Sequence, residues 1–143
     1  MGFALPAAIG AKMAAPEREV VAIIGDGGYQ MTIQELGTIF QQKTPVKVVV
    51  LNNDFLGMVR QWQQLFFDKR YSFVELENPD FVKIADGFGV KGKKITDASE
   101  IDNGINEMLQ HEGPFLLHVM VEKEENIFPM IASGKAVDEI SLE

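Results

Sequence analysis

Three glycines around one carboxylate are the first residues of this sequence that could do chemistry. Gly25-Asp26-Gly27-Gly28 directly follows the apolar, β-branched run Val20–Ile24. Glycines let a ligand approach the backbone, and N–H groups at the start of a helix suit an anion such as a phosphate. Asp26 alone would repel a diphosphate, and no Lys or Arg lies between residues 20 and 42. A divalent cation between Asp26 and the phosphate oxygens removes this conflict.

A second polar segment supplies further oxygen ligands. Asn52-Asn53 directly follows the apolar run Val46–Leu51. Amide oxygens, loop carbonyls and phosphate oxygens around a cation are typical of Mg²⁺ rather than zinc. A single segment of this kind is more often an ordinary turn than a binding site. Two such segments, each directly after a strand, indicate a binding site more specifically. The sequence therefore predicts Mg²⁺ and a phosphate-bearing ligand at these loops.

The elements that must position these loops alternate between strands and helices. Short apolar runs indicate strands, and apolar residues at helical spacing between caps and prolines indicate helices. We expect strands at Val20–Ile24, Val46–Leu51, Val90–Ile95 and Phe115–Val121, and helices at Phe3–Ala15, Thr32–Gln42, Met58–Phe67, Pro79–Gly87 and after Asp97.

This alternation predicts a parallel sheet with helices on both faces, a three-layer α/β/α fold. We expect one domain over residues 1–143, with an irregular tail from about residue 122. Two helix starts are assigned by their caps: Thr32 with Glu35 as a capping box, and Asn78 before Pro79. In such sheets ligands bind at the carboxyl ends of the strands, where both polar segments lie. His118, inside an apolar strand, is interpreted as a core histidine rather than a ligand.

Composition excludes several classes of function. The chain has 143 residues, with 13 Lys+Arg against 21 Asp+Glu, a net charge of −8 and no Cys. An acidic chain without a basic stripe is not expected to bind nucleic acid. The absence of Cys excludes disulfides and thiolate chemistry and fits a cytoplasmic location. No apolar run approaches the roughly 18 residues of a membrane span, and the amino terminus is a poor signal peptide, so no membrane partner is expected.

Several motifs of this chain carry a family resemblance. Gly25-Asp26-Gly27 followed by Asn52-Asn53 resembles the thiamine diphosphate (ThDP) signature of a class of enzymes. Four longer stretches narrow the resemblance: Leu56-Gly-Met-Val-Arg-Gln-Trp62, the most specific run, and Gly2–Ala11, Pro79–Ala85 and Asn126–Met130. Together they resemble the carboxyl-terminal cofactor domain of the acetolactate synthase (acetohydroxyacid synthase) catalytic subunit. The resemblance covers essentially the whole chain, and it implies a ThDP-binding fold.

The resemblance also implies a role for individual residues. Asp26, Asn53 and the main-chain oxygen of Phe55 would bind Mg²⁺. The residues that would contact the cofactor are Gly25, Gly27, Gly28, Gly57, Met58, Val59 and Met1. Trp62 would shape the pocket for the second substrate.

The implied activity is the condensation of pyruvate with a second 2-oxo acid, pyruvate or 2-oxobutyrate, with loss of CO₂, in branched-chain amino-acid biosynthesis. In the family, an activating glutamate comes from the amino-terminal domain of a neighbouring subunit, and a middle domain binds FAD. Neither domain is recognised in these residues, so no catalytic residue is assigned and the chain is expected to be inactive alone. A homo-oligomer, dimer or tetramer, and a regulatory small subunit are the expected protein partners.

Two other interpretations stay open. One is a different ThDP enzyme, such as glyoxylate carboligase, sulfoacetaldehyde acetyltransferase or pyruvate oxidase, although Trp62 and Asn126–Met130 favour acetolactate synthase. The other is a non-catalytic module that binds Mg²⁺ and phosphate.

Overall fold

Strands and helices alternate along the chain in the order that the sequence predicts. The structure is a computed structural model that describes residues 1–142. The strands are β1 (Val21–Gly25), β2 (Lys47–Asn52), β3 (Lys91–Ile95) and β4 (Phe115–Met120). The α-helices are α1 (Ala4–Ala14), α2 (Asp26–Gln30), α3 (Leu36–Gln42), α4 (Gly57–Phe66), α5 (Phe81–Gly87) and α6 (Ile101–Gln110), with 3₁₀ turns η1 (Ile33–Glu35) and η2 (Ala98–Glu100).

The four strands form one parallel sheet in the order β1-β2-β4-β3. Gly25, the last residue of β1, pairs with Leu51 near the end of β2, so both strands finish at the same edge. This register brings Asp26, the next residue after β1, to the level of Asn52. Parallel pairing thus joins the two polar segments, which are far apart in sequence.

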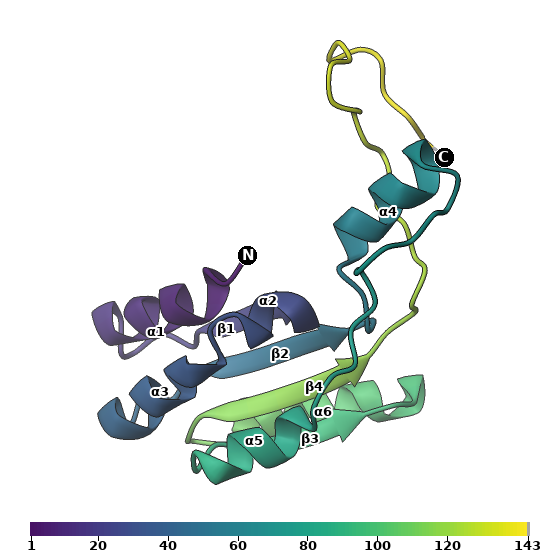
Figure 1. Ribbon diagram of the computed structural model, residues 1–143. Helices are drawn as coiled ribbons and strands as arrows, with labels where there is room; N and C mark the ends of the chain where they lie inside the picture. The colour runs from purple at the N-terminus through teal and green to yellow at the C-terminus, as the bar shows by residue number, and fades with distance from the viewer. Residues whose placement is uncertain (143) are drawn as a thin grey trace.

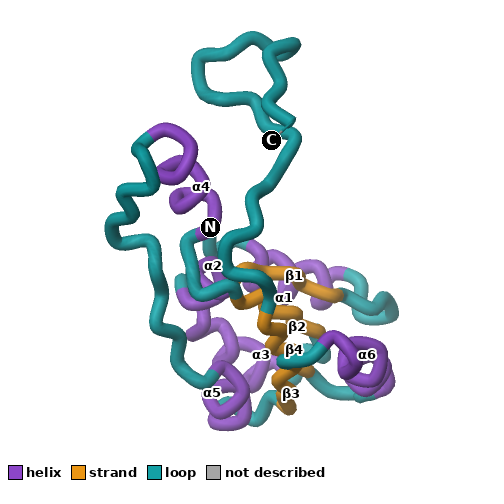
Figure 2. Tube along the Cα trace, turned by 90° about the vertical axis from the view of Figure 1, so that its right-hand side faces the viewer, coloured by secondary structure: helices purple, strands orange, loops and turns teal. Residues whose placement is uncertain are grey.

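Helices cover both faces of the sheet, which confirms the predicted three-layer α/β/α fold. On one face α1, α3 and α5 pack over the sheet around a core that includes Leu5, Ile39, Val48 and Phe81, with α1 against β1 and α5 against β3 and β4. On the other face α6 packs over β3 and β4, with Met108 against Ile95 and Leu117. Figure 2 shows α5 and α6 on opposite sides of the strands.

Two predicted helix caps are wrong. Thr32 and Glu35 form no capping box, because the Glu35 carboxylate accepts instead from the Thr38 hydroxyl at 2.8 Å and the predicted helix is divided into η1 and α3. Asn78 does not cap α5. Asp80 does so, accepting from the N–H groups of Val82 and Lys83, both at 3.1 Å.

Helix α4 and the tail project from the sheet side by side (Figure 1). Arg60 is completely buried and donates to the Asn126 side chain at 2.6 Å. Gln61 pairs with Ile127 through two hydrogen bonds, accepting at 2.8 Å and donating at 3.0 Å. These contacts hold the irregular tail along the helix that begins at Gly57.

Within residues 1–142, no helix combines the length and the apolar character that crossing a membrane requires.

Candidate functional site

A cavity of about 570 Å³ lies at the carboxyl ends of β1 and β2. Its wall includes every residue that the sequence predicts for cofactor and metal binding: Met1, Gly25, Asp26, Gly27, Gly28, Asn53, Phe55, Gly57, Met58 and Val59. Apolar side chains, among them Ile23, Leu51 and Leu56, line the remaining wall. Among residues 1–142, Asp26 is the one acidic residue of this wall. The cavity therefore has a polar floor at the strand ends and an apolar mouth.

The floor of the cavity is the first turn of a short helix rather than the loop expected from the sequence. Helix α2 starts at Asp26, so the N–H groups of Gly27 and Gly28 precede the first possible helical hydrogen bond. A Cβ added at Gly27 would lie 2.7 Å from Leu56, whereas one added at Gly25 would meet nothing within 4 Å. The space beside Gly25 is thus open to a ligand.

Asp26 is a buried carboxylate without a cationic partner. It is 2% exposed, and it forms no ion pair with any of residues 1–142. Burial raises the pKa of Asp26, and the hydrogen bond from Asn78 opposes this shift in part. Burying an unpaired charge is costly, so a cation beside Asp26 would stabilise its ionised form.

Two more oxygen atoms lie in the turn between β2 and α4. The Asn53 side-chain oxygen accepts from the Phe55 N–H at 3.2 Å, which folds the turn back on itself. Asp54 between them adopts a left-handed conformation with φ of 56°. Among residues 1–142, no hydrogen-bond donor pairs with the Phe55 carbonyl. One carboxylate, one amide and one carbonyl make the kind of oxygen set that suits Mg²⁺.

No cluster of three or more His, Cys, Asp or Glu side chains suited to a metal occurs among the described residues. A cation site at Asp26 thus depends on neutral oxygens and on the ligand's own phosphates.

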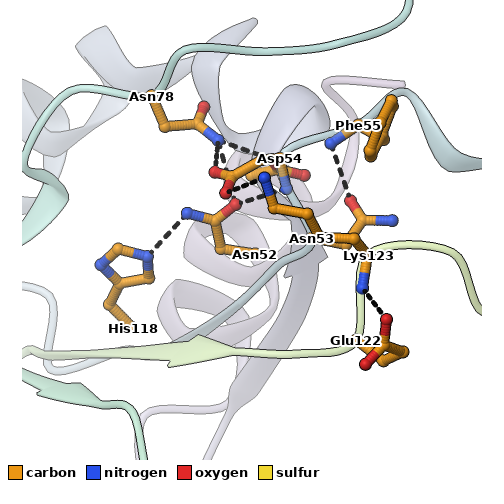
Figure 3. Close-up of polar contacts among 9 residues, drawn as sticks. Asn52, Asn53, Asp54, Phe55, Asn78, His118, Glu122 and Lys123 are labelled. Carbon is orange, nitrogen blue, oxygen red and sulfur yellow. Dashed lines mark hydrogen bonds and ion pairs between the residues drawn. The ribbon is translucent and has the colours of Figure 1, made fainter.

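Asn78 is a site residue that the sequence analysis missed. Its side-chain nitrogen lies 2.7 Å from Asp26 Oδ2, 3.0 Å from Asn52 Oδ1 and 3.1 Å from Asp54 Oδ1. Figure 3 shows Asn78 beside Asn52 and Asp54. Local spacing indicated a helix cap, because Asn before Pro is common at helix starts. No signal in the sequence places residue 78 beside residue 26.

His118 supports this network from β4. The backbone N–H of Asp54 donates to Asn52 Oδ1 at 2.9 Å, so the Asn52 amide nitrogen faces His118 Nε2, 3.0 Å away. His118 Nε2 is therefore an acceptor, and its proton lies on Nδ1, which is buried without a partner among the described residues. Burial lowers the pKa of His118 and Lys94 adds to this effect, while Asp80 and Asp54 oppose it. His118 is a core histidine, as expected, and it also orients Asn52.

Helix α4 brings side chains to the mouth of the cavity. Met58 and Val59 in its first turn line the cavity and are 46% and 45% exposed. Trp62, one turn further on, is half-buried, stacks on Phe66 with ring centroids 4.9 Å apart, and does not line the cavity. Its predicted role in substrate selectivity stays a prediction.

Comparisons with known proteins agree with this geometry. The family described as thiamine pyrophosphate enzyme, C-terminal TPP binding domain, matches residues 1–119. Acetolactate synthase isozyme 2 large subunit of Escherichia coli (strain K12) is 48% identical over 141 residues, which are 98% of this chain and 26% of that protein. The mitochondrial acetolactate synthase catalytic subunit of Saccharomyces cerevisiae is 46% identical over 139 residues, 97% of this chain and 20% of that protein.

A solved structure shows the same fold. The thiamine diphosphate-dependent 4-hydroxybenzoylformate decarboxylase of Rhodococcus jostii RHA1 superposes with a TM-score of 0.81 at 32% identity, over 88% of this chain and 24% of that one. The chain therefore spans about a quarter or less of the length of these relatives. The resemblance to the acetolactate synthase cofactor domain, first seen in the motifs, is confirmed.

The open space beside Gly25 gives a first prediction. Gly25 has extended backbone, with φ of −72° and ψ of 153°, so a Gly25→Val side chain fits the fold but projects into open space. We expect thiamine diphosphate binding, measured by calorimetry with Mg²⁺, to weaken at least tenfold. The free energy of unfolding should stay within about 1 kcal/mol, since valine favours strands. Gly10→Val, at another open glycine outside the cavity, is the control, and equal binding by both variants would refute the prediction.

The buried His118 predicts a pH dependence of stability. Because its pKa is lower in the folded chain than the usual value near 6.5, the unfolded chain binds the proton more readily. The free energy of unfolding should therefore fall as pH decreases from 7.5 through 6.5 to 5.5. Urea unfolding should show a smaller fall for His118→Gln than for wild type. His111→Gln is the control for removing a histidine, and an equal pH response in all three chains would contradict this assignment.

Proposed function

This chain belongs to the thiamine pyrophosphate enzymes, as their C-terminal TPP-binding domain, and we propose that its cavity binds thiamine diphosphate through a Mg²⁺ ion. The observation that carries this proposal is the buried carboxylate of Asp26, which has no cationic partner in residues 1–142. Asn53 and the Phe55 carbonyl would complete the protein's ligands. Their common position on the cavity wall supports this assignment.

The remaining wall residues suit the two ends of the cofactor. The diphosphate would lie over the first turn of α2, where the Gly27 and Gly28 N–H groups can donate to phosphate oxygens. The aromatic rings would lie against the apolar mouth, which Met1, Met58 and Val59 line. When bound, thiamine diphosphate supplies an electron sink for decarboxylation and carbon–carbon bond formation.

Residues of this chain would hold the cofactor and exclude water, but they would not supply the acidic side chain that activates the cofactor. Asp26 is the one acidic residue that the described part of the chain, residues 1–142, places on the cavity wall, and we assign it to the cation. The activating glutamate that the family resemblance implies would thus come from outside these residues. FAD, likewise, would bind elsewhere in a longer protein.

Replacing the Asp26 carboxylate tests the proposed function. Asp26→Asn keeps the size and an oxygen acceptor for Asn78 but removes the charge. We expect Mg²⁺-dependent binding of thiamine diphosphate, measured by calorimetry, to be lost. Without metal at pH 7 the variant should be at least as stable to urea as wild type. This follows because the raised pKa of Asp26 means that its ionised form is destabilised by folding.

The matched control is Asp138→Asn, which removes an exposed carboxylate from the tail. It should bind the cofactor like wild type. Wild-type affinity in Asp26→Asn would contradict the metal assignment, and tighter binding of ATP than of thiamine diphosphate would favour a general Mg²⁺ and phosphate module.

The reaction that we propose for the whole protein is acetolactate synthesis, in which pyruvate condenses with a second 2-oxo acid and CO₂ is lost. The support is the 48% and 46% identity to proteins named acetolactate synthase. The structural relative acts on 4-hydroxybenzoylformate according to its name, so the fold alone does not select this substrate. The role in branched-chain amino-acid synthesis, the oligomer and a regulatory subunit belong to the same proposal. A cytoplasmic location stays a prediction, since two relatives are named as mitochondrial.

A substitution at Trp62 tests whether this side chain determines which second substrate is used. In a full-length protein that carries this domain, Trp62→Leu should change the ratio of acetohydroxybutyrate to acetolactate about tenfold when pyruvate and 2-oxobutyrate compete, since lost pocket contacts are worth about 1–3 kcal/mol. Phe66→Leu, at its stacking neighbour, is the control. An unchanged product ratio in Trp62→Leu would remove Trp62 as an argument for acetolactate synthase.

A further inference from the structure

We propose that Asn78 is a positioning residue that holds the Asp26 carboxylate in place for the cation. This inference rests on the proposed function of Asp26. Among residues 1–142, Asn78 is the only residue whose side chain donates to Asp26, and the distance from its nitrogen to Oδ2 is 2.7 Å. Asn78 acts through Asp26 and is not itself assigned a contact with the metal or the cofactor.

The orientation of the Asn78 amide is fixed by its neighbours. Its oxygen accepts from the Gln30 side chain at 2.6 Å, so its nitrogen must face the other way. On that side lie three acceptors, on Asp26, Asn52 and Asp54. Because Gln30 ends the helix that Asp26 begins, both ends of α2 contact this one amide.

The two carboxylates beside Asn78, those of Asp26 and Asp54, differ in their cationic partners. Asp54 and Asp26 both accept from the same nitrogen, and two carboxylates this close repel each other. Lys123 lies 3.5 Å from Asp54 Oδ2 and offsets the charge of Asp54. Among residues 1–142 Asp26 has no such partner, so its negative charge is left without an opposite charge.

The chemistry of an asparagine suits this position. A lysine here would pair with Asp26 and compete with the metal, and an aspartate would add a third negative charge. The amide orients the carboxylate through hydrogen bonds without neutralising it. Asn52 and His118 extend the support into β2 and β4, so the amide is anchored in the sheet.

Substitution of Asn78 tests this role, and the quantity to measure is the affinity of the chain for Mg²⁺ at saturating thiamine diphosphate. Asn78→Ala should raise the Kd for Mg²⁺ 10- to 100-fold, the usual effect of removing a hydrogen-bond partner of a metal ligand. Asn103→Ala, at an exposed asparagine of α6, should leave the Kd unchanged. A Kd for Asn78→Ala within twofold of wild type would overturn the proposal.

A measurement on the wild-type chain covers the case in which Asn78→Ala does not fold. The side-chain amide signal of Asn78 in a ¹⁵N–¹H spectrum should shift when Mg²⁺ and thiamine diphosphate are added together, and should not shift in Asp26→Asn. If the wild-type chain binds the cofactor but the Asn78 signal does not shift, the positioning role of Asn78 is overturned and the proposed function is not. A wild-type chain that binds no thiamine diphosphate with Mg²⁺ overturns the proposed function instead.

Discussion

A negative charge buried without a positive partner is the constraint on which this site depends. Asp26 follows directly after β1, and the fold takes its carboxylate out of water at the sheet edge. Such burial is unfavourable unless hydrogen bonds and a cation compensate for the lost hydration. Among residues 1–142, the neighbours of Asp26 provide hydrogen bonds and neutral oxygens but no cationic side chain. This unbalanced charge is the physical reason for the cation that we propose beside Asp26.

Parallel strand pairing is what brings the parts of this site together. The register of β1 with β2 places the ends of both strands at one edge, and β4 lies on the other side of β2. Asn52, at the end of β2, can therefore contact His118 on one side and Asn78 on the other. Polar groups that would be costly to bury singly satisfy one another as a connected network. The network also ties the segment before α5 to the strand ends.

The apolar part of the cavity has a different origin. Met58 and Val59 come from α4, which projects beyond the sheet and is held by the tail rather than by the core. Arg60 and Gln61, which do not line the cavity, make those tail contacts. Helix α4 thus supplies apolar side chains to the mouth of the cavity and also the side chains that attach the helix to the tail. The polar floor follows the strand ends, and this projecting helix supplies part of the apolar mouth.

The sequence by itself determined the order of most elements, the parallel α/β/α fold and part of the cavity wall. These depend on local patterns: apolar runs, glycine-rich turns and motifs that recur in a family. It misassigned Thr32, Glu35 and Asn78, because a polar residue before a helix is an equally good local cap whether or not a distant acceptor competes for it. Tertiary structure alone decided that Asn78 contacts Asp26, 52 residues away. It also decided that Lys123 faces Asp54 rather than Asp26, since only strand pairing and chain packing set which charges become neighbours.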